Sequence, residues 1–146
     1  MIYLGSDHAG LALKNKIEKH IQSKKIKVVD LGVFAAEPPT DYPEIAHEVA
    51  EKVREKAQVG ARGILVCGTG IGMCMAANKN PGIRAAVCES VKTVEMSRMH
   101  NDANVLCLGG RVLDEATALK MVDAFLNTKF EAEERHIRRI NKIDKK

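Results

Sequence analysis

Short apolar runs alternate with longer amphipathic segments along the whole chain. The runs have the length of buried strands, and each ends close to a glycine, a proline or a charged residue. They occupy residues 2–4, 26–30, 63–66, 84–88 and 105–108. Five strands separated by helical segments are typical of an α/β protein with a parallel sheet.

The segments between the runs carry apolar residues at helical spacing. They form one face with Leu13, Ile17 and Ile21, a second with Ile45, Val49, Val53 and Ala57, and a third with Leu119, Val122, Phe125 and Leu126. Asp114 precedes the third face and is a candidate helix cap. We therefore expect one α/β domain over residues 1–146, a Rossmann-like three-layer sandwich with a parallel five-stranded sheet and helices on both faces.

Polar and glycine-rich clusters follow three of the predicted strands. They are Gly5-Ser6-Asp7-His8, Cys67-Gly68-Thr69 and Gly109-Gly110-Arg111. Ligands of open parallel sheets bind at the carboxyl ends of the strands, where the strand order changes direction. The three clusters are therefore expected to meet at one edge of the sheet and to form the ligand site there.

The most informative of these clusters is the turn after the third strand. Cys67 is followed by Gly68-Thr69-Gly70-Ile71-Gly72 and then by a helix-prone segment. A glycine turn at a helix N-terminus offers free N–H groups that stabilise an anion and favour the thiolate form of a nearby cysteine. A potential base therefore lies beside a potential oxyanion hole.

Other functions of this turn fit less well. The G-x-G-x-G spacing differs from that of dinucleotide sites, and Met73-Cys74 replaces the Lys-Ser/Thr pair of a P-loop. A cysteine phosphatase would need an arginine at the position of Met73. A purely structural turn that buries a small apolar cysteine stays open on these residues alone.

Composition and charge narrow the function classes. The 146 residues are 45% hydrophobic and 29% charged, with 3% aromatic residues and a net charge of +4. The few aromatics and the modest charge, much of it in Lys142, Lys145 and Lys146, argue against nucleic-acid binding. Neither a membrane span nor a signal peptide is visible, so a cytoplasmic location without membrane contact is expected.

The four cysteines form no C-x-x-C pair, and no His or carboxylate cluster has metal-ligand spacing. We interpret Cys67, Cys74, Cys88 and Cys107 as reduced thiols and expect no metal.

The last segment, residues 131–146, has a helical pattern. Ile137, Ile140 and Ile143 form a small apolar stripe, and Arg135 and Arg139 share another face. One interpretation is a solvated helix with Glu131–Arg135 and Glu134–Arg138 pairs. The other is a C-terminal helix that contacts a neighbouring subunit.

Taken together, several motifs resemble the ribose-5-phosphate isomerase B family, which includes galactose-6-phosphate and allose-6-phosphate isomerases. The resemblance covers nearly the whole chain. It is carried by Gly5-Ser6-Asp7-His8, Asp41-Tyr42-Pro43, Cys67 to Gly72, Ala76-Ala77-Asn78-Lys79, Gly82-Ile83-Arg84-Ala85, Ser97-Arg98, His100 to Asn104, Gly109 with Arg111-Val112, and Arg135-His136 with Arg139.

The resemblance implies an aldose–ketose isomerase that works without a cofactor, through an enediolate. Cys67 would be the base that moves a proton between C2 and C1, and His100 would open the sugar ring. Asp7 would bind sugar hydroxyls or assist ring opening. The N–H groups of Gly68, Thr69, Gly70, Ile71 and Gly72 would hold the enediolate, with help from the Thr69 hydroxyl.

The resemblance also implies a phosphate site and an oligomer. His8, Arg111, Arg135 and Arg139 match phosphate-binding positions, and arginine suits phosphate oxygens well. A homodimer or a dimer of dimers is expected, with Asn101 and Arg111 among the residues supplied by the neighbouring subunit.

The substrate is expected to be ribose 5-phosphate and ribulose 5-phosphate, and two alternatives stay open. One is a six-carbon aldose phosphate, because the loop over residues 32–40 carries no diagnostic pattern and Glu133-Glu134 stands where the family commonly has glycines. The other is a sensor that binds a sugar phosphate without catalysis. A sensor needs no base, so the combination of Cys67, Thr69 and His100 favours the enzyme.

Overall fold

A computed structural model describes residues 1–145, and Lys146 lies outside the described residues. Five strands form one parallel sheet in the order β2-β1-β3-β5-β4. The strands are β1 (Ile2–Ser6), β2 (Val28–Asp30), β3 (Arg62–Cys67), β4 (Ala85–Val87) and β5 (Val105–Gly109). The five predicted strands and the parallel sheet are confirmed, with bounds that shift by one or two residues at most ends.

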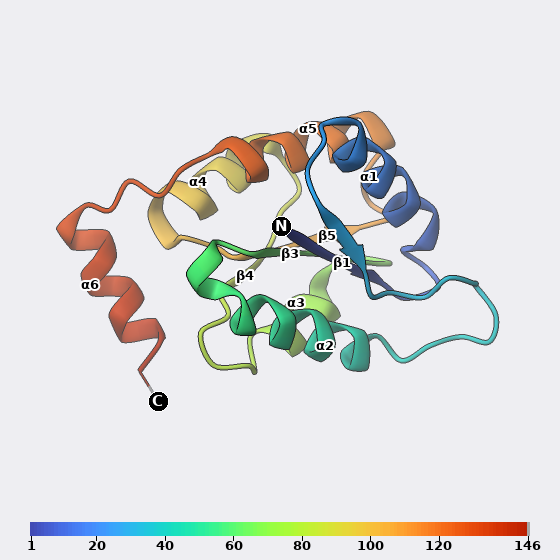
Figure 1. Cartoon of the computed structure of the whole chain (residues 1–146), viewed down its shortest axis with the longest axis horizontal. Helices are drawn as coiled ribbons and strands as arrows, with labels where there is room; N and C mark the ends of the chain where they lie inside the picture. The colour runs from blue at the N-terminus through green and yellow to red at the C-terminus, as the bar shows by residue number, and fades with distance from the viewer. Residues whose placement is uncertain (146) are drawn as a thin grey trace.

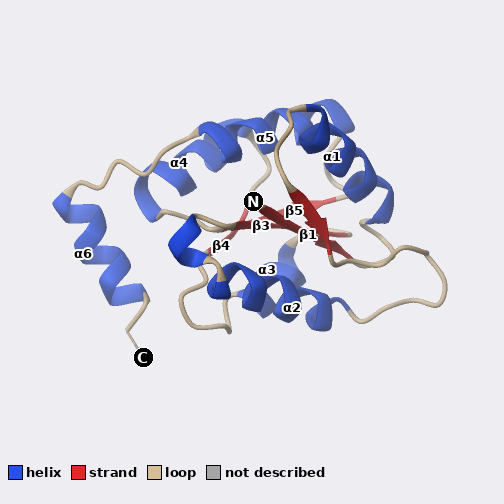
Figure 2. Cartoon of the chain, viewed as in Figure 1, coloured by secondary structure: helices blue, strands red, loops and turns tan. Residues whose placement is uncertain are grey.

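Helices cover both faces of the sheet (Figures 1 and 2). They are α1 (Leu11–Ser23), α2 (Tyr42–Glu55), α3 (Ile71–Ala77), α4 (Val91–Asn101), α5 (Glu115–Asn127) and α6 (Glu134–Ile143). Helices α1, α4 and α5 lie on one face and α2 and α3 on the other, while α6 stands beside the sheet near the end of α4 (Figure 1). The three-layer α/β sandwich is therefore confirmed.

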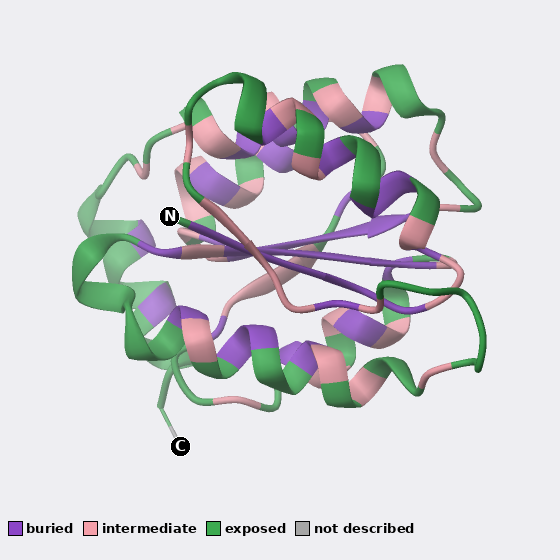
Figure 3. Cartoon of the chain, turned by 45° about the vertical axis from the view of Figure 1, so that its right-hand side comes forward, coloured by how far each residue is buried: buried purple, intermediate pink, exposed green. Residues whose placement is uncertain are grey.

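Two apolar cores hold the layers together, and β3 shows how the sequence divides between them. Ile64 and Val66 point to the core under α1, α4 and α5, whereas Leu65 and Cys67 point to the core under α2 and α3. Successive side chains of a strand face opposite sides, so a run that is apolar throughout is what a doubly covered strand requires. Figure 3 shows buried residues along the central strands β1, β3 and β5 and exposed residues on the outer helix faces.

The start of α5 and the end of α2 can be compared with the helix ends predicted from the sequence. The Asp114 side chain accepts a hydrogen bond from the Thr117 N–H at 2.9 Å, so the expected cap of α5 is confirmed. The extension of the second apolar face to Ala57 is wrong. Helix α2 ends at Glu55, and Ala57 begins an exposed 3-10 turn, Ala57–Val59, that leads into β3.

The strand order changes direction between β1 and β3. From β1 the chain first adds β2 on one side and then crosses to β3 on the other. Helix α1 after β1 and helix α3 after β3 pack on opposite faces, so the carboxyl ends of these two strands border a crevice. Among residues 1–145, no helix has the length and apolar character to cross a bilayer.

Candidate functional site

A cleft of about 510 Å³ opens at this switch point. The three polar clusters predicted to meet there do so, because each follows a strand that ends at this edge. The cleft is lined by Asp7, His8, Ala9, Tyr42, Cys67, Gly68, Thr69, Ile71, Gly72, Met75 and Arg111. Its volume lies within the range of small-molecule sites.

The glycine turn brings free amides to the thiol at the base of the cleft. Gly70 has φ 81°, a left-handed conformation that glycine adopts without strain, and this reverses the chain from β3 into α3. The reversal points the Gly70 N–H at Cys67 Sγ, 3.1 Å away. Cys67 is 5% exposed, so this donor stabilises negative charge on a sulfur that water barely reaches.

Asp7 and His8 enter the cleft from the end of β1. The Asp7 carboxylate accepts a hydrogen bond from the Gly10 N–H at 2.9 Å, which fixes its side chain just before α1 begins. This bond closes the turn that leads to Gly10, the N-cap of α1, while Asp7 keeps a position in the cleft. His8 Nδ1 is buried without a hydrogen-bond partner among the described atoms. A buried polar nitrogen of this kind gains most from a polar ligand such as a phosphate oxygen.

Arg111 lies in the same cleft as Cys67 of its own chain. Its N–H donates to the Gly68 carbonyl at 3.0 Å, and its side chain runs along Gly68, where a Cβ would lie 3.5 Å from the guanidinium. The expectation that Arg111 comes from the neighbouring subunit is therefore wrong for this cleft. The cause is the pairing of Cys67 with Gly109, which places the two strand ends side by side.

Tyr42 is a wall of the cleft that the sequence did not assign. It is the first residue of α2, and its ring lies so close to Gly72 that a Cβ there would come within 2.6 Å of it. The sign of this contact in the sequence was Gly72 itself. Glycine destabilises a helix, so a glycine in the first turn indicates a place where another residue packs closely against the helix backbone. Tyr42 stays 40% exposed, so its hydroxyl is free to meet a ligand.

The other thiols lie outside the cleft. A hydrogen bond with Cys107 lowers the pKa of Cys74 to about 7, and burial raises the pKa of Cys107 well above its usual range. Cys74 Sγ also lies 3.4 Å from the Ala85 carbonyl, so this sulfur points toward β4 and away from the glycine turn. Cys74 is thus the thiol with a lowered pKa, but it lies outside the cleft. Cys67 is the cysteine that lies where chemistry in the cleft would take place.

His100 and Asn101 lie at the opposite edge of the sheet. They end α4, whose chain continues into the start of β5 at Val105. Val105 pairs with Gly63 and Gly109 pairs with Cys67, so four residue steps along the strands, about 13 Å, separate the two edges. The structure therefore does not bring His100 or Asn101 to the Cys67 cleft of the same chain.

The two tail arginines belong to this second edge as well. Arg135 and Arg139 are exposed on α6, which packs near the end of α4. The Arg135 guanidinium lies 2.7 Å from Glu133, so the predicted Glu131–Arg135 pair is wrong. Glu131 instead lies 3.9 Å from both His100 Nε2 and His136 Nε2.

Arg84 connects the parts of the second edge. Its Nε–H donates to the carbonyls of Asn101 and Asp102, each at 3.1 Å, and its two terminal nitrogens lie 2.9 Å from the carboxylates of Asp102 and Asp144. One guanidinium thus ties the end of α4 to the end of α6. Helices α4 and α6 are thus held together at this edge, away from the cleft, and they carry His100, Asn101, Arg135 and Arg139.

Comparison with known proteins finds similar sequences over nearly the whole chain. The family described as Ribose/Galactose Isomerase matches residues 2–143. The ribose-5-phosphate isomerase B of Escherichia coli is 43% identical over 142 residues, which cover 97% of this chain and 93% of that protein. The resemblance seen in the sequence motifs is confirmed.

Solved structures extend the likeness to the whole fold. The ribose-5-phosphate isomerase B of Mycoplasma genitalium, solved with bound ribulose-5-phosphate, has a TM-score of 0.94 and 47% identity and covers 98% of this chain and 93% of that one. The Clostridium thermocellum ribose-5-phosphate isomerase B has a TM-score of 0.93 and 44% identity, with coverage of 98% and 94%.

Proposed function

This chain belongs to the Ribose/Galactose Isomerase family, and we propose that it interconverts ribose 5-phosphate and ribulose 5-phosphate. The reaction moves one proton between C2 and C1 of the open sugar through an enediolate. It needs a base beside those carbons, donors for the enediolate oxygens, an acid–base group that opens the ring, and cations for the phosphate.

The glycine turn supplies the first two requirements. Cys67 is the base, since its sulfur accepts a hydrogen bond from the Gly70 N–H and faces the cleft. It takes the proton from C2 and returns it to C1, while the hydroxyl proton of O2 passes to O1. C2 is oxidised and C1 is reduced within the same sugar, so the step needs no external oxidant or reductant. Gly68, Thr69 and Gly72 of the turn line the same cleft, and their amides and the Thr69 hydroxyl are the donors proposed for the developing oxyanion, where preorganised donors lower the barrier most.

Ring opening requires a second copy of the chain. His100 is the residue proposed for this step, yet it lies at the far edge of its own sheet. In a twofold dimer each copy offers its Cys67 edge to the His100 edge of the other, which produces two equivalent sites. We propose that Asn101, Arg135 and Arg139 enter the site with His100 in this way, because Arg84 and α6 hold them at the same edge.

The phosphate then meets cations from both chains. His8 and Arg111 approach from the cleft that holds Cys67, and Arg135 and Arg139 from the partner. Arginine forks give charge-assisted hydrogen bonds to phosphate oxygens, and each is worth about 1.5–3 kcal/mol. Loss of one arginine is therefore expected to slow turnover of dilute substrate by about ten- to a hundredfold.

The observation that carries the proposal is the Cys67 thiol at the cleft, which accepts a hydrogen bond from the Gly70 N–H. Its test is hydrogen exchange at C2 of ribose 5-phosphate in heavy water, followed by NMR, together with a panel of five- and six-carbon aldose phosphates. Exchange and ketose formation with ribose 5-phosphate are expected. Binding without exchange would make the protein a sensor, and a higher kcat/KM on a hexose phosphate would reassign the substrate.

A further inference from the structure

Three potential metal ligands meet at the edge that carries His100. The ligand atoms of His100, Glu131 and His136 all lie within 4.8 Å of one another. They come from the end of α4, from the segment before α6, and from α6. This group could not be predicted from the sequence, because 30 residues lie between His100 and Glu131 and only the fold brings them together.

His136 is the member that needs an explanation. It is 4% exposed, and its Nε2 has no hydrogen-bond partner among the described atoms. That nitrogen faces two carboxylates, Glu131 and Glu133, each at 3.9 Å, which is too far for a hydrogen bond. A buried ring nitrogen without a partner is costly, and a ligand between it and the carboxylates would remove the cost.

The His100 ring completes the group from the solvent side. It stacks on His136 with the ring centres 4.7 Å apart and an angle of 11° between the planes. Parallel rings direct their nitrogen lone pairs side by side, so a cation bound by both rings requires one of them to turn. The His100 side chain is 34% exposed, so it has room to turn its Nε2 toward the same point as the buried His136.

We propose that His100, Glu131 and His136 form a binding site for a divalent transition-metal ion of the Zn²⁺ type. Two imidazole nitrogens and one carboxylate oxygen are a common zinc ligand set, with water as the fourth ligand. Tetrahedral zinc needs ligand atoms about 3.3 Å apart. The two 3.9 Å separations from Glu131 must therefore shrink by about half an ångström, and the two imidazole nitrogens, which lie within 4.8 Å of each other, must also move together. Side-chain rotation of exposed Glu131 and half-exposed His100 provides this movement.

The ion would act as a reversible inhibitor, and this part rests on the proposed function of His100. A ring nitrogen that coordinates zinc has no free lone pair or proton for ring opening. Cys67 lies at the other edge of its own chain, so the ion leaves the thiolate base free. Zinc should therefore slow reaction of the cyclic sugar and spare proton transfer on the open-chain ketose.

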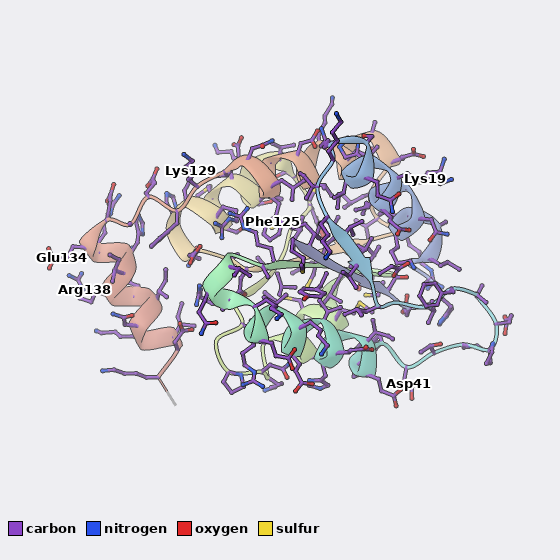
Figure 4. The ribbon with its side chains drawn as sticks, viewed as in Figure 1. Lys19, Asp41, Phe125, Lys129, Glu134 and Arg138 are labelled. Atoms are coloured by element: carbon purple, nitrogen blue, oxygen red, sulfur yellow. The ribbon has the colours of Figure 1, made fainter. Side chains whose placement is uncertain are left out.

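Binding is tested without any reference to activity. Zn²⁺ is titrated by calorimetry into the full chain carrying Cys67→Ala, and the absorption spectrum of the Co²⁺ complex is recorded. One ion per chain is expected, without a sulfur-to-cobalt charge-transfer band. Glu131→Gln should weaken binding at least tenfold. The matched control is Glu134→Gln, whose side chain projects from the outer side of α6 and should change binding less than twofold (Figure 4).

Three results would overturn the site: no binding to the Cys67→Ala chain, binding that Glu131→Gln leaves unchanged, or a thiolate band in the Co²⁺ spectrum. His136→Gln adds a second ligand test, with a thermal melt to show that the variant is folded.

The inhibitory effect is measured separately on the wild-type chain. Zn²⁺ should slow ribose 5-phosphate isomerisation at least tenfold and leave C1 hydrogen exchange of ribulose 5-phosphate within twofold. Equal inhibition of both reactions would refute the capture of His100. If the chain binds zinc as expected but isomerises no sugar phosphate, the proposed function fails and the metal site stands.

Discussion

The two edges of the sheet are built in different ways. At the carboxyl edge, Asp7, Cys67 and Arg111 each follow directly on a strand, so the sheet alone brings them together. At the amino edge, His100 and Asn101 close α4, and the α6 arginines are held nearby by long-range contacts through Arg84. One edge is thus specified locally, and the other depends on contacts between distant parts of the chain.

In the proposed mechanism, this difference explains why a single chain contributes two half-sites and not one complete site. A helix that follows a parallel strand runs back along it, so residues at the helix end lie at the edge opposite the strand end. His100 and Cys67 are therefore kept apart by the topology itself, whatever the side chains do. The following predictions test the division of roles between the edges.

Replacement of Cys67 is expected to have the largest effect. Cys67→Ala should fold normally and lose about 10³-fold or more of its isomerase activity, since the general base is removed. The matched control is Cys74→Ser, because Cys74 lies nearby on α3 but points toward β4. Activity is measured on ribose 5-phosphate and folding by circular dichroism. Near-normal turnover of Cys67→Ala would rule out the thiolate base.

Mixed dimers test whether the two edges belong to different chains. Cys67→Ala and His100→Asn chains, each nearly inactive on ribose 5-phosphate, are co-expressed with different tags. A mixed dimer has one site with both changes and one intact site, so random pairing should restore about a quarter of normal activity.

Two carboxyl-edge variants provide the control for this experiment. Cys67→Ala mixed with Arg111→Ala leaves every site damaged, because both residues line the same cleft. Recovery in this control, or no recovery in purified mixed dimers of the first pair, would contradict the assignment of the two edges.

His100→Asn separates ring opening from proton transfer. The variant should lose about 10²-fold on ribose 5-phosphate, which must open before it reacts. Hydrogen exchange at C1 of ribulose 5-phosphate should fall much less, because that ketose carries phosphate on O5 and cannot close a furanose ring. Both rates are followed by NMR under first-order conditions. Equal losses would assign His100 to another step.

The smallest expected effect concerns the Glu133 carboxylate that pairs with Arg135. Glu133→Gln should lower KM for ribose 5-phosphate by about two- to fivefold and leave kcat unchanged, since an exposed ion pair competes only weakly for the arginine. Glu134→Gln is the control with the same change of charge. A higher KM in Glu133→Gln would mean that the pair orients Arg135 for phosphate.

The residues of the carboxyl edge could be predicted from the sequence far better than those of the amino edge. Alternating apolar runs placed the strands, and polar residues after them identified Asp7, Cys67 and Arg111, because strand and turn signals lie within a few residues. Tyr42 was missed as a wall of the cleft, since its approach to Gly72 joins two helices that are distant in sequence.

The same limit applies to the amino edge. The pairing of Arg135 with Glu133, the meeting of Glu131 with two histidines, and the ties of Arg84 to Asp102 and Asp144 follow from how α6 packs beside α4. Helical periodicity predicted that the segment over residues 131–146 is a helix, but a helical wheel shows only which residues share a face. It contains no information about the element that the face will meet.

The strand order also has a consequence for the order of assembly. Strand β4 pairs only with β5, although β5 follows it by a whole helix, and β5 lies between β4 and the rest of the sheet. During synthesis, β1, β2 and β3 can pair as soon as they emerge, whereas β4 stays without a partner until β5 has joined β3. The segment with Arg84 and α4 is thus the last part of the sheet to be fixed, and long-range pairing of this kind slows folding. The side of the cleft formed by β1 and β3 consequently takes shape before β5 brings Arg111 to it and before the amino edge is in place.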